Sequence, residues 1–373
     1  MTDPVLARAT AALKNLFIAD ALAMPVHWFY NVGDIDRAFP DGITTFEAPP
    51  EFHPTSIMSM HSTRSGGRKR TENAAPEIVG DVILKGKQGY WNRPNVHYHQ
   101  GMQPGDNTLN AHCALTLMHS MAETHQHYDS DAFLKAYIQL MTAETPAHPD
   151  TYAESYHRGF FASLEKGLPA NKCGAVTHDT PSIGGLVTIA PLAIGERLNA
   201  TSLADTRTRC RQHLALTHPD AFLADVCDAY VELIDNLLFR ENDDHIEEAL
   251  LNATRGLAKR ELRQLVHSQL SEREVIGSKL STACYITDAW PAVLYLACKY
   301  HDNPMRALQV NAEVGGDSVH RGSVLGVLLG LINAEAADEV KIRRSSVVLG
   351  HGGSAEESSS AARHGEQRDG HGQ

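Results

Sequence analysis

The feature that most constrains the fold is a succession of apolar stripes at helical spacing, which fills most of the chain after residue 108. Leu109, Cys113, Leu117 and Met121 recur every three or four residues, as they do along one face of a helix. Further helices are expected over residues 5–24, 133–141, 149–166, 183–198, 221–239, 245–257, 260–270, 284–300, 304–312 and 319–334. No alternating run is flanked by hairpin turns. The sequence therefore predicts an all-α globule of ten or more helices with a buried central pair.

Two stretches depart from this pattern. Between about residues 28 and 105, aromatic residues, prolines and glycines are interleaved without a stable period. Such a long irregular stretch inside a domain often covers or lines a site. Beyond residue 341 the chain is rich in Ser, Gly and His, with too little apolar content to fold. We expect one folded domain over residues 1–341 and a disordered tail over residues 342–373.

Charge excludes two classes of partner. The 373-residue chain has a net charge of -12 and a pI near 5.9. A protein that binds nucleic acids or membrane surfaces needs a concentrated basic face. One basic cluster, around Gly66 and Gly67, contains Arg64, Arg68, Lys69 and Arg70. A solvated loop is the favoured interpretation of this cluster, and contact with a phosphate is the alternative.

The cysteines and the first residues indicate a cytoplasmic protein. The six cysteines form no CxxC pair and most lie in apolar helical runs, as is typical of small buried side chains in a reducing compartment. The N-terminal sequence lacks the basic and apolar regions of a signal peptide. We expect no apolar run to approach the ~18 residues of a membrane-spanning helix, so no membrane partner is expected.

Two short segments, 104–110 and 315–318, place an acidic residue after a glycine at the start of an apolar helix. The acids are Asp106 and Asp317. Each taken alone is more typical of a helix N-cap than of a ligand. If the two helix starts meet in space, however, their carboxylates form a site. The oxygen donors Asp106, Asn107, Asp317 and Ser318 suit Mg²⁺, and free N–H groups at the helix starts suit a pyrophosphate equally well.

Other candidate residues lie in three further segments. The loop 178–185, with Thr180, Ser182, Gly184 and Gly185, leads into the most apolar stretch of the chain. Its glycines allow either close approach of a ligand or close helix packing. His218 precedes a proline and, taken alone, marks a helix start. The segment 97–99 carries two histidines, but no further ligand follows at metal spacing, so a polar loop is favoured.

Five segments in order resemble motifs of the ADP-ribosylglycohydrolase family, in its crystallin-J and selenoprotein-J branch. Residues 20–28 resemble the opening G-D-A-L-G-x-P-x-E, 105–108 stand where T-D-D-T is found, 182–191 resemble the G-N-G helix start, 217–219 match T-H-P, and 315–320 stand where G-G-D-T-D-T is found. The resemblance covers residues 5–335. Segments 53–58 and 97–100 suggest the crystallin-J branch.

The resemblance implies an all-α fold that binds ADP-ribose with two Mg²⁺ ions and hydrolyses the bond from ribose to an acceptor side chain. If the protein is a hydrolase, we expect Asp106 and Asp317 to position the sugar while His27 or His320 transfers a proton. Further substrate-binding residues would be Asn107, Thr180, Ser182, Gly184, Gly185, Gly315, Gly316 and His218. Only Asp106 and Asp317 of the expected carboxylates are retained, since Asn107, Val319 and His27 replace acids. At most one weakly held Mg²⁺ is therefore expected.

Three functions are compatible with these residues. The first is hydrolysis of an N- or O-glycosidic ADP-ribosyl linkage with a degenerate magnesium site. The second is binding of ADP-ribose or an ADP-ribosylated substrate without turnover, as a pseudoenzyme. The third is a structural, crystallin-like role. The polar residues retained in the motifs favour a ligand over the structural role, and we place the hydrolase first and the binder second.

Overall fold

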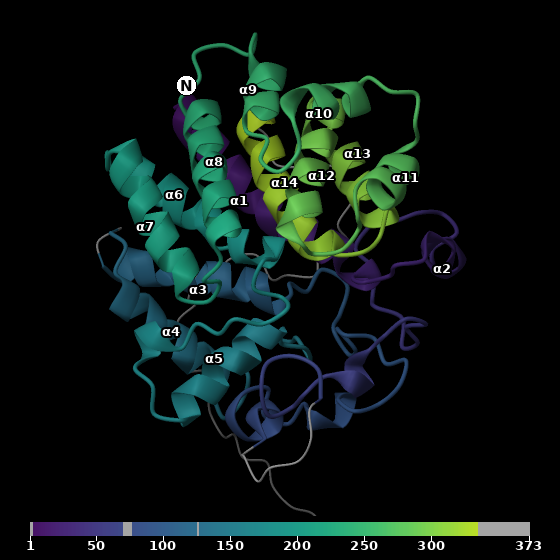
Figure 1. Cartoon of the computed structure of the whole chain (residues 1–373), viewed down its shortest axis with the longest axis vertical. Coiled ribbons are helices and arrows are strands. Elements are labelled where there is room, and N and C mark those ends of the chain that lie inside the picture. Colours follow the sequence, from purple (N-terminus) through teal and green to yellow (C-terminus); the bar gives the residue numbers. More distant parts are fainter. Residues whose placement is uncertain (1–2, 70–76, 125–126, 335–373) are drawn as a thin grey trace, which may run out of the picture.

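The computed structural model describes residues 3–69, 77–124 and 127–334, and this part of the chain is built from α-helices joined by loops and short 3₁₀ or π turns (Figure 1). No strand is present in it, only isolated bridges such as that between Ser182 and Tyr285. The prediction of an all-α fold is therefore confirmed. The helices are α1 (Pro4–Ala23), α2 (Val32–Ala38), α3 (Leu109–Glu123), α4 (Ser130–Thr142), α5 (Ser155–Glu165), α6 (Ile189–Leu198), α7 (Leu203–Ala215), α8 (Ala221–Leu238), α9 (Ile246–Asn252), α10 (Lys259–Val266), α11 (Glu272–Glu274), α12 (Ile286–Tyr300), α13 (Pro304–Glu313) and α14 (Ser318–Asn333).

A buried central pair is present and consists of α1 and α14, the first and last helices, which lie side by side (Figure 1). Every residue of α14 up to Ile332 is buried. A Cβ atom added at Gly326 would lie 2.4 Å from the carbonyl oxygen of Asn15, and one at Gly330 would lie 2.5 Å from the backbone of Ala11. The glycines of α14 therefore allow its backbone to approach that of α1 closely.

Helix α1 is more apolar than expected. With the following turn, as far as Val26, it is long and apolar enough to cross a membrane, and the expectation that no such run exists is wrong. However, 72% of that window is buried inside the protein. Its apolarity is explained by packing against α14, because the core helix of a globular domain passes the same test.

Helix α7 has no counterpart in the predicted pattern. Its buried positions are Thr206, Cys210, His213 and Leu214, so small polar and aromatic side chains replace the aliphatic stripe. Helix α5 also begins later than predicted, since residues 150–154 are not helical. All six cysteines are free, and all but the partly exposed Cys284 are buried, as predicted. The expected tail and its boundary at residue 341 lie outside the described residues.

Many histidines are buried in the described part of the chain. They are His27, His53, His61, His97, His99, His148, His157, His213, His218 and His320. Burial lowers the pKa of His53 to about 4 and the pKa values of His61, His213 and His218 to about 3. These imidazoles are therefore neutral in the folded protein at neutral pH.

The close approach of α1 and α14 leads to a mutational prediction. Gly330→Ala should lower the free energy of unfolding by about 3 kcal/mol or more, because the added methyl group meets backbone atoms that cannot rotate away. Urea denaturation followed by circular dichroism measures the change. Gly89→Ala is the matched control, since a Cβ atom there meets nothing within 4 Å. Equal stability of the two variants would contradict the close packing.

The buried histidines predict acid lability. The unfolded chain protonates its histidines near pH 6.5, whereas His53 and His213 of the folded protein resist protonation until about pH 4 and about pH 3. The unfolded state therefore binds more protons in this window, and stability is complete above about pH 6.5 and lost as the pH falls. Each such histidine costs about 2 kcal/mol by about pH 5.

Urea denaturation at a series of pH values measures this loss. The His213→Gln variant should show a shallower pH dependence than the parent, because one proton is removed from the difference between the states. A free energy of unfolding that stays constant between about pH 7.5 and pH 5 would contradict the prediction.

Candidate functional site

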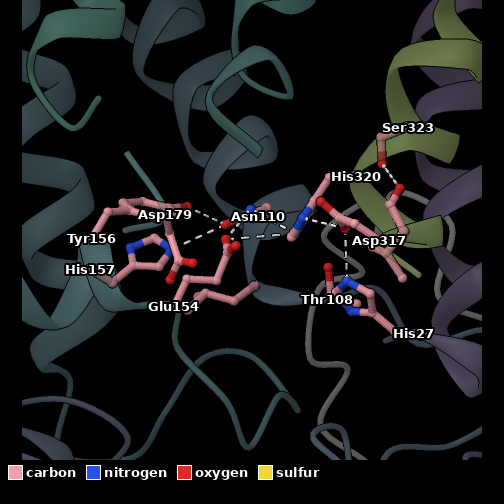
Figure 2. Close-up of polar contacts among 12 residues, drawn as sticks. His27, Thr108, Asn110, Glu154, Tyr156, His157, Asp179, Asp317, His320 and Ser323 are labelled. Carbon is pink, nitrogen blue, oxygen red and sulfur yellow. Dashed lines mark hydrogen bonds and ion pairs between the residues drawn. The ribbon is translucent and has the colours of Figure 1, made fainter. Parts of the chain in front are cut away.

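A polar cluster lies where the starts of α3, α5 and α14 converge with the turn that follows α1. Figure 2 shows its central residues, Glu154, Asn110, His320 and Asp317, in a row, with His27 beside Asp317. Each of these five side chains is buried. Buried polar groups require partners, so the contacts of this cluster define what it can do.

A double-glycine turn delivers Asp317 to the cluster. Gly315 and Gly316 have φ values of 71° and 67°, which favour glycine, and a Cβ atom at Gly316 would lie 2.0 Å from the carbonyl oxygen of Thr282. The amide of Gly316 donates to the carbonyl oxygen of Phe29 at 2.7 Å, and the amide of Asp317 donates to that of Thr282 at 2.9 Å. Gly315 and Gly316 were predicted to bind substrate. In the structure they form the turn that positions Asp317.

The carboxylate of Asp317 lies between two imidazoles. Its Oδ1 atom is 2.9 Å from Nε2 of His27 and 2.8 Å from Nδ1 of His320. Its Oδ2 atom is buried without a hydrogen-bond partner. Although Asp317 occupies the N-cap position of α14, its side chain makes no capping bond. Burial favours the neutral acid, but His320 and His27 together hold the pKa of Asp317 well below its usual value.

His27 continues into a second buried pair. Its Nδ1 atom is 2.7 Å from Nε2 of His99, and Nδ1 of His99 is 2.8 Å from Oδ1 of Asp150. Asp150 also accepts from the backbone amides of Leu109 and Thr151. A continuous chain of contacts therefore joins Asp317 to Asp150 through two histidines. Burial, opposed by Asp317, lowers the pKa of His27 to about 3.

Trp28 supports this histidine chain with its ring, and its own backbone is in a strained conformation. Its ring stacks on His27 with centroids 3.7 Å apart, and its φ is 61°. A positive φ is a rare conformation for a bulky residue and costs about 1–3 kcal/mol. The bond from the Trp28 amide to the carbonyl oxygen of Gly316, at 2.8 Å, fixes this conformation. The turn at Gly316 therefore positions both Asp317 and the ring that supports His27.

On the other side of Asp317, His320 meets a second carboxyl group. Nε2 of His320 is 2.8 Å from Nδ2 of Asn110, which also donates to Oε2 of Glu154 at 2.8 Å. Nε2 of His320 and Oε2 of Glu154 are 3.7 Å apart. Burial, opposed by His320, raises the pKa of Glu154 to about 7. Despite burial, Asp317 and Glu154 raise the pKa of His320 to about 10.

A small cavity of about 10 Å³ is lined by this cluster, with His27, His99, Asn110, Glu154 and His320 among its walls. That volume is enough for about one water molecule. A much wider groove, of about 590 Å³, is lined by Gly66, Gly67, Arg68, Lys69, Thr177, His178 and Tyr285. Gly66 packs against the start of α5, since a Cβ atom there would lie 2.4 Å from the carbonyl oxygen of Ser155. The groove therefore adjoins the segment that carries Glu154.

Asp106 is not part of the group of potential metal ligands that contains Asp317. Among the residues described, the cluster of ligand atoms close enough to hold a metal ion consists of His27, Asp317 and His320. Oδ2 of Asp106 instead accepts from the amide of Gln103, within its own turn, at 2.8 Å. One oxygen of the Asp106 carboxylate is thus used within its own turn.

Asp20 organises the start of α3. Its carboxylate accepts from Nδ2 of Asn107 at 2.9 Å, and from the amide and hydroxyl of Thr108 at 2.8 and 2.6 Å. Asn107, predicted as a metal ligand, is thus held by Asp20 and by the carbonyl oxygen of Phe17. Ser318, the other predicted oxygen donor, points its hydroxyl at the carbonyl oxygen of Ala23, 3.4 Å away.

The loop 178–185 lies next to the cluster, and His218 packs against this loop. A Cβ atom at Gly184 would lie 3.2 Å from Nδ2 of Asn110 and 3.4 Å from Oε2 of Glu154, so this glycine borders the site directly. Gly185 packs against the ring of His218. Thr180 holds its own loop through a bond to the carbonyl oxygen of Ala175. Ser182 is buried without a hydrogen-bond partner for its hydroxyl.

Sequence reasoning missed Glu154, Asp150 and the role of His99. Asp150 and Glu154 were assigned to a helix, whereas they lie in the extended segment before α5, which turns both carboxylates inward. The two histidines of segment 97–99 were visible, but their partners are more than fifty residues away along the chain, so spacing gave no signal.

The roles of the two acids near α3 lead to a matched pair of variants. Asp20→Ala should lower the free energy of unfolding by about 3 kcal/mol or more, because the buried amide and hydroxyl of Thr108 lose their acceptor and Asn107 loses one of its two. Asp106→Ala should cost about 1 kcal/mol, as a lost turn bond. Urea denaturation measures both values. A larger loss for Asp106→Ala than for Asp20→Ala would reverse the assignment.

Comparison with known proteins assigns the family. The family model described as ADP-ribosylglycohydrolase matches residues 1–337. A solved structure titled "ADP-ribosylglycohydrolase-related protein complex" is similar at 16% identity and a TM-score of 0.45, covering 87% of this chain and 88% of the other. No curated protein matches. The family suggests glycohydrolase activity and ADP-ribosylated substrates. On the match to residues 1–337, the chain belongs to the ADP-ribosylglycohydrolase family.

Proposed function

We propose that the protein hydrolyses an N- or O-glycosidic linkage between ADP-ribose and an acceptor. The observation that carries this proposal is the pair of proton-exchanging groups, Glu154 and His320, bridged by Asn110 on the wall of a cavity the size of one water molecule. Family membership supports the class of reaction and of substrate.

The two groups divide the proton transfers of hydrolysis. The Glu154 carboxylate accepts a proton from water as the water oxygen bonds to the anomeric carbon. The bond from that carbon to the acceptor atom breaks, and imidazolium His320 gives its proton to the departing atom. Asn110 fixes both groups, because its amide contacts each of them while Tyr156 and His157 contact its oxygen. These contacts supply the orientation that acid–base catalysis requires.

The nucleotide part of the substrate needs more room than the small cavity offers. The groove of about 590 Å³ is within the size range of small-molecule sites. Arg68 and Lys69 line it and suit a diphosphate. We place the diphosphate there, with the ribose directed toward Glu154 at the adjoining start of α5. This agrees with the alternative interpretation of the basic cluster, contact with a phosphate.

The residues present do not fit a pair of Mg²⁺ ions. The group around Asp317 has one carboxylate and two imidazoles, whereas Mg²⁺ prefers oxygen ligands. Asp106, Asn107 and Ser318 are engaged elsewhere. The mechanism above therefore uses only side chains of this chain. We also propose a cytoplasmic location, which the free cysteines support.

A second candidate is binding of ADP-ribose without turnover. The observation that favours it is the burial of the central groups: Asp317 is 0% exposed, His320 3% and Glu154 5%. A site closed to this degree restricts access of a macromolecular substrate to the reacting groups.

Replacement of Glu154 tests the hydrolase. Glu154→Gln keeps the shape and the contact with Asn110 but cannot accept a proton, so release of ADP-ribose from modified arginine or serine peptides should fall by about 10²-fold or more. Chromatography of released ADP-ribose measures the rate. Glu165→Gln, exposed near the other end of α5, is the matched control and should keep the parent rate.

Calorimetric titration with ADP-ribose separates the two candidates. Binding by the parent protein without any release from peptides supports the non-catalytic binder. Turnover that survives Glu154→Gln unchanged would contradict the assigned role, and absence of both binding and turnover would contradict both functions.

A further inference from the structure

Neutral histidines cannot supply a hydrogen to every contact around Asp317. The contact left without one joins Nε2 of His27 to Oδ1 of Asp317. Oδ1 of Asp150 accepts from backbone amides, so Nδ1 of His99 carries the hydrogen of the contact between them. A neutral His99 then accepts at Nε2 from Nδ1 of His27. A neutral His27 is left with a lone pair at Nε2, which faces the carboxylate oxygen of Asp317 at 2.9 Å. Two acceptors therefore face each other unless a positive charge lies between them.

Two further atoms at the same point are without hydrogen-bond partners. Oδ2 of Asp317 is fully buried and unpaired. Nδ1 of His320 is 2.8 Å from Oδ1 of Asp317, an ion-pair distance, yet it is buried without a hydrogen-bond partner of suitable geometry. Buried polar atoms without partners are rare, and a bound ion is one explanation. All these atoms are potential metal ligands.

We propose that His27, His320 and Asp317 bind one divalent transition-metal ion of the zinc type, in a form of the protein in which neutral His320 no longer serves as the acid of the proposed hydrolysis. The three ligand atoms lie within 4.8 Å of one another. Two imidazoles and one carboxylate are a typical ligand set for catalytic zinc, with the fourth position left to water or substrate. Nitrogen ligands disfavour Mg²⁺, so the site differs in metal class from the one that the resemblance implies.

Two of the three separations between ligand atoms need only a small adjustment. Zinc–ligand bonds of about 2.0–2.1 Å in a tetrahedral site separate ligand atoms by roughly 3.3 Å. The contacts of 2.9 and 2.8 Å therefore have to widen by about half an ångström, which side-chain rotation supplies. The water-sized cavity touches both His27 and His320 and provides room for the fourth ligand.

The surroundings support ligation by both histidines. His99 accepts from His27 and is itself fixed by Asp150, the arrangement that holds a metal-bound histidine in one tautomer. The orientation of the Asn110 amide determines which nitrogen of His320 carries the proton. Rotation of this amide by 180° turns the Asn110 oxygen toward Nε2 of His320. His320 then donates at Nε2 and offers Nδ1 to the metal, while the amide nitrogen faces the oxygen of Tyr156 and Nε2 of His157, which can accept. The rotated amide oxygen also faces Oε2 of Glu154, which in this arrangement is protonated and donates to it.

The test uses the full-length chain stripped with a chelator and titrated with Zn²⁺ against a chromophoric competitor. One tight equivalent should bind, and a large excess of Mg²⁺ should not displace it. His320→Gln should weaken that equivalent by about 100-fold or more, and His99→Gln by about 10- to 100-fold. The histidines beyond residue 342 are unchanged in every variant. Any weak Zn²⁺ binding by them is therefore the same in the parent and in each variant, and it does not affect the comparison. His213→Gln, a buried histidine outside the group, is the matched control and should bind as the parent does.

A second readout identifies the ligands. Co²⁺ bound to the parent should give the visible absorption of a site with two nitrogen ligands, and this band should disappear in His320→Gln. Absence of a tight equivalent in the parent, or equal affinity of the parent and His320→Gln, would overturn the proposal. Both results concern binding alone, so they stand apart from the outcome of the hydrolase assays.

Discussion

The interaction on which the rest of the site depends is the contact of the buried Asp317 carboxylate with two imidazoles. The central helix α14 begins at this residue, and the turn of Gly315 and Gly316 sets its position against Phe29 and Thr282. The same turn fixes the strained Trp28, whose ring supports His27. A carboxylate with no access to solvent is stable only when opposite charge or donors compensate for it. Asp317 therefore links the packing of the core to the chemistry of the site.

The cluster extends in two directions from this carboxylate. Through His27 and His99 it reaches Asp150, whose second oxygen holds the first amide of α3. Through His320 and Asn110 it reaches Glu154 at the start of α5. Three helix starts are thus joined by side chains rather than by packing alone. Because all these groups are buried, a change at one of them alters the positions of the others.

Much of the fold could be predicted from the sequence, because apolar stripes at helical spacing are local and strong. Helix α7 was not predicted, since its buried face holds Thr206, Cys210 and His213 and only one aliphatic residue, Leu214. Asp317, His27 and His320 were predicted as site residues and lie together. Asp106 was chosen for a glycine-acid motif, but its carboxylate bonds to Gln103 in the same turn. Glu154 and Asp150 could not be found by spacing, because an extended segment and partners distant in sequence determine where they point.

The central claim is that the reacting centre lies between Glu154 and Asp317 and not at the turn of Asp106. A crystal structure of the protein with ADP-ribose tests it most directly. The account predicts the diphosphate beside Arg68 and Lys69, with the ribose directed to Glu154 and His320. ADP-ribose bound at Asp106 and Asn107, with Glu154 and His320 out of reach, would contradict it.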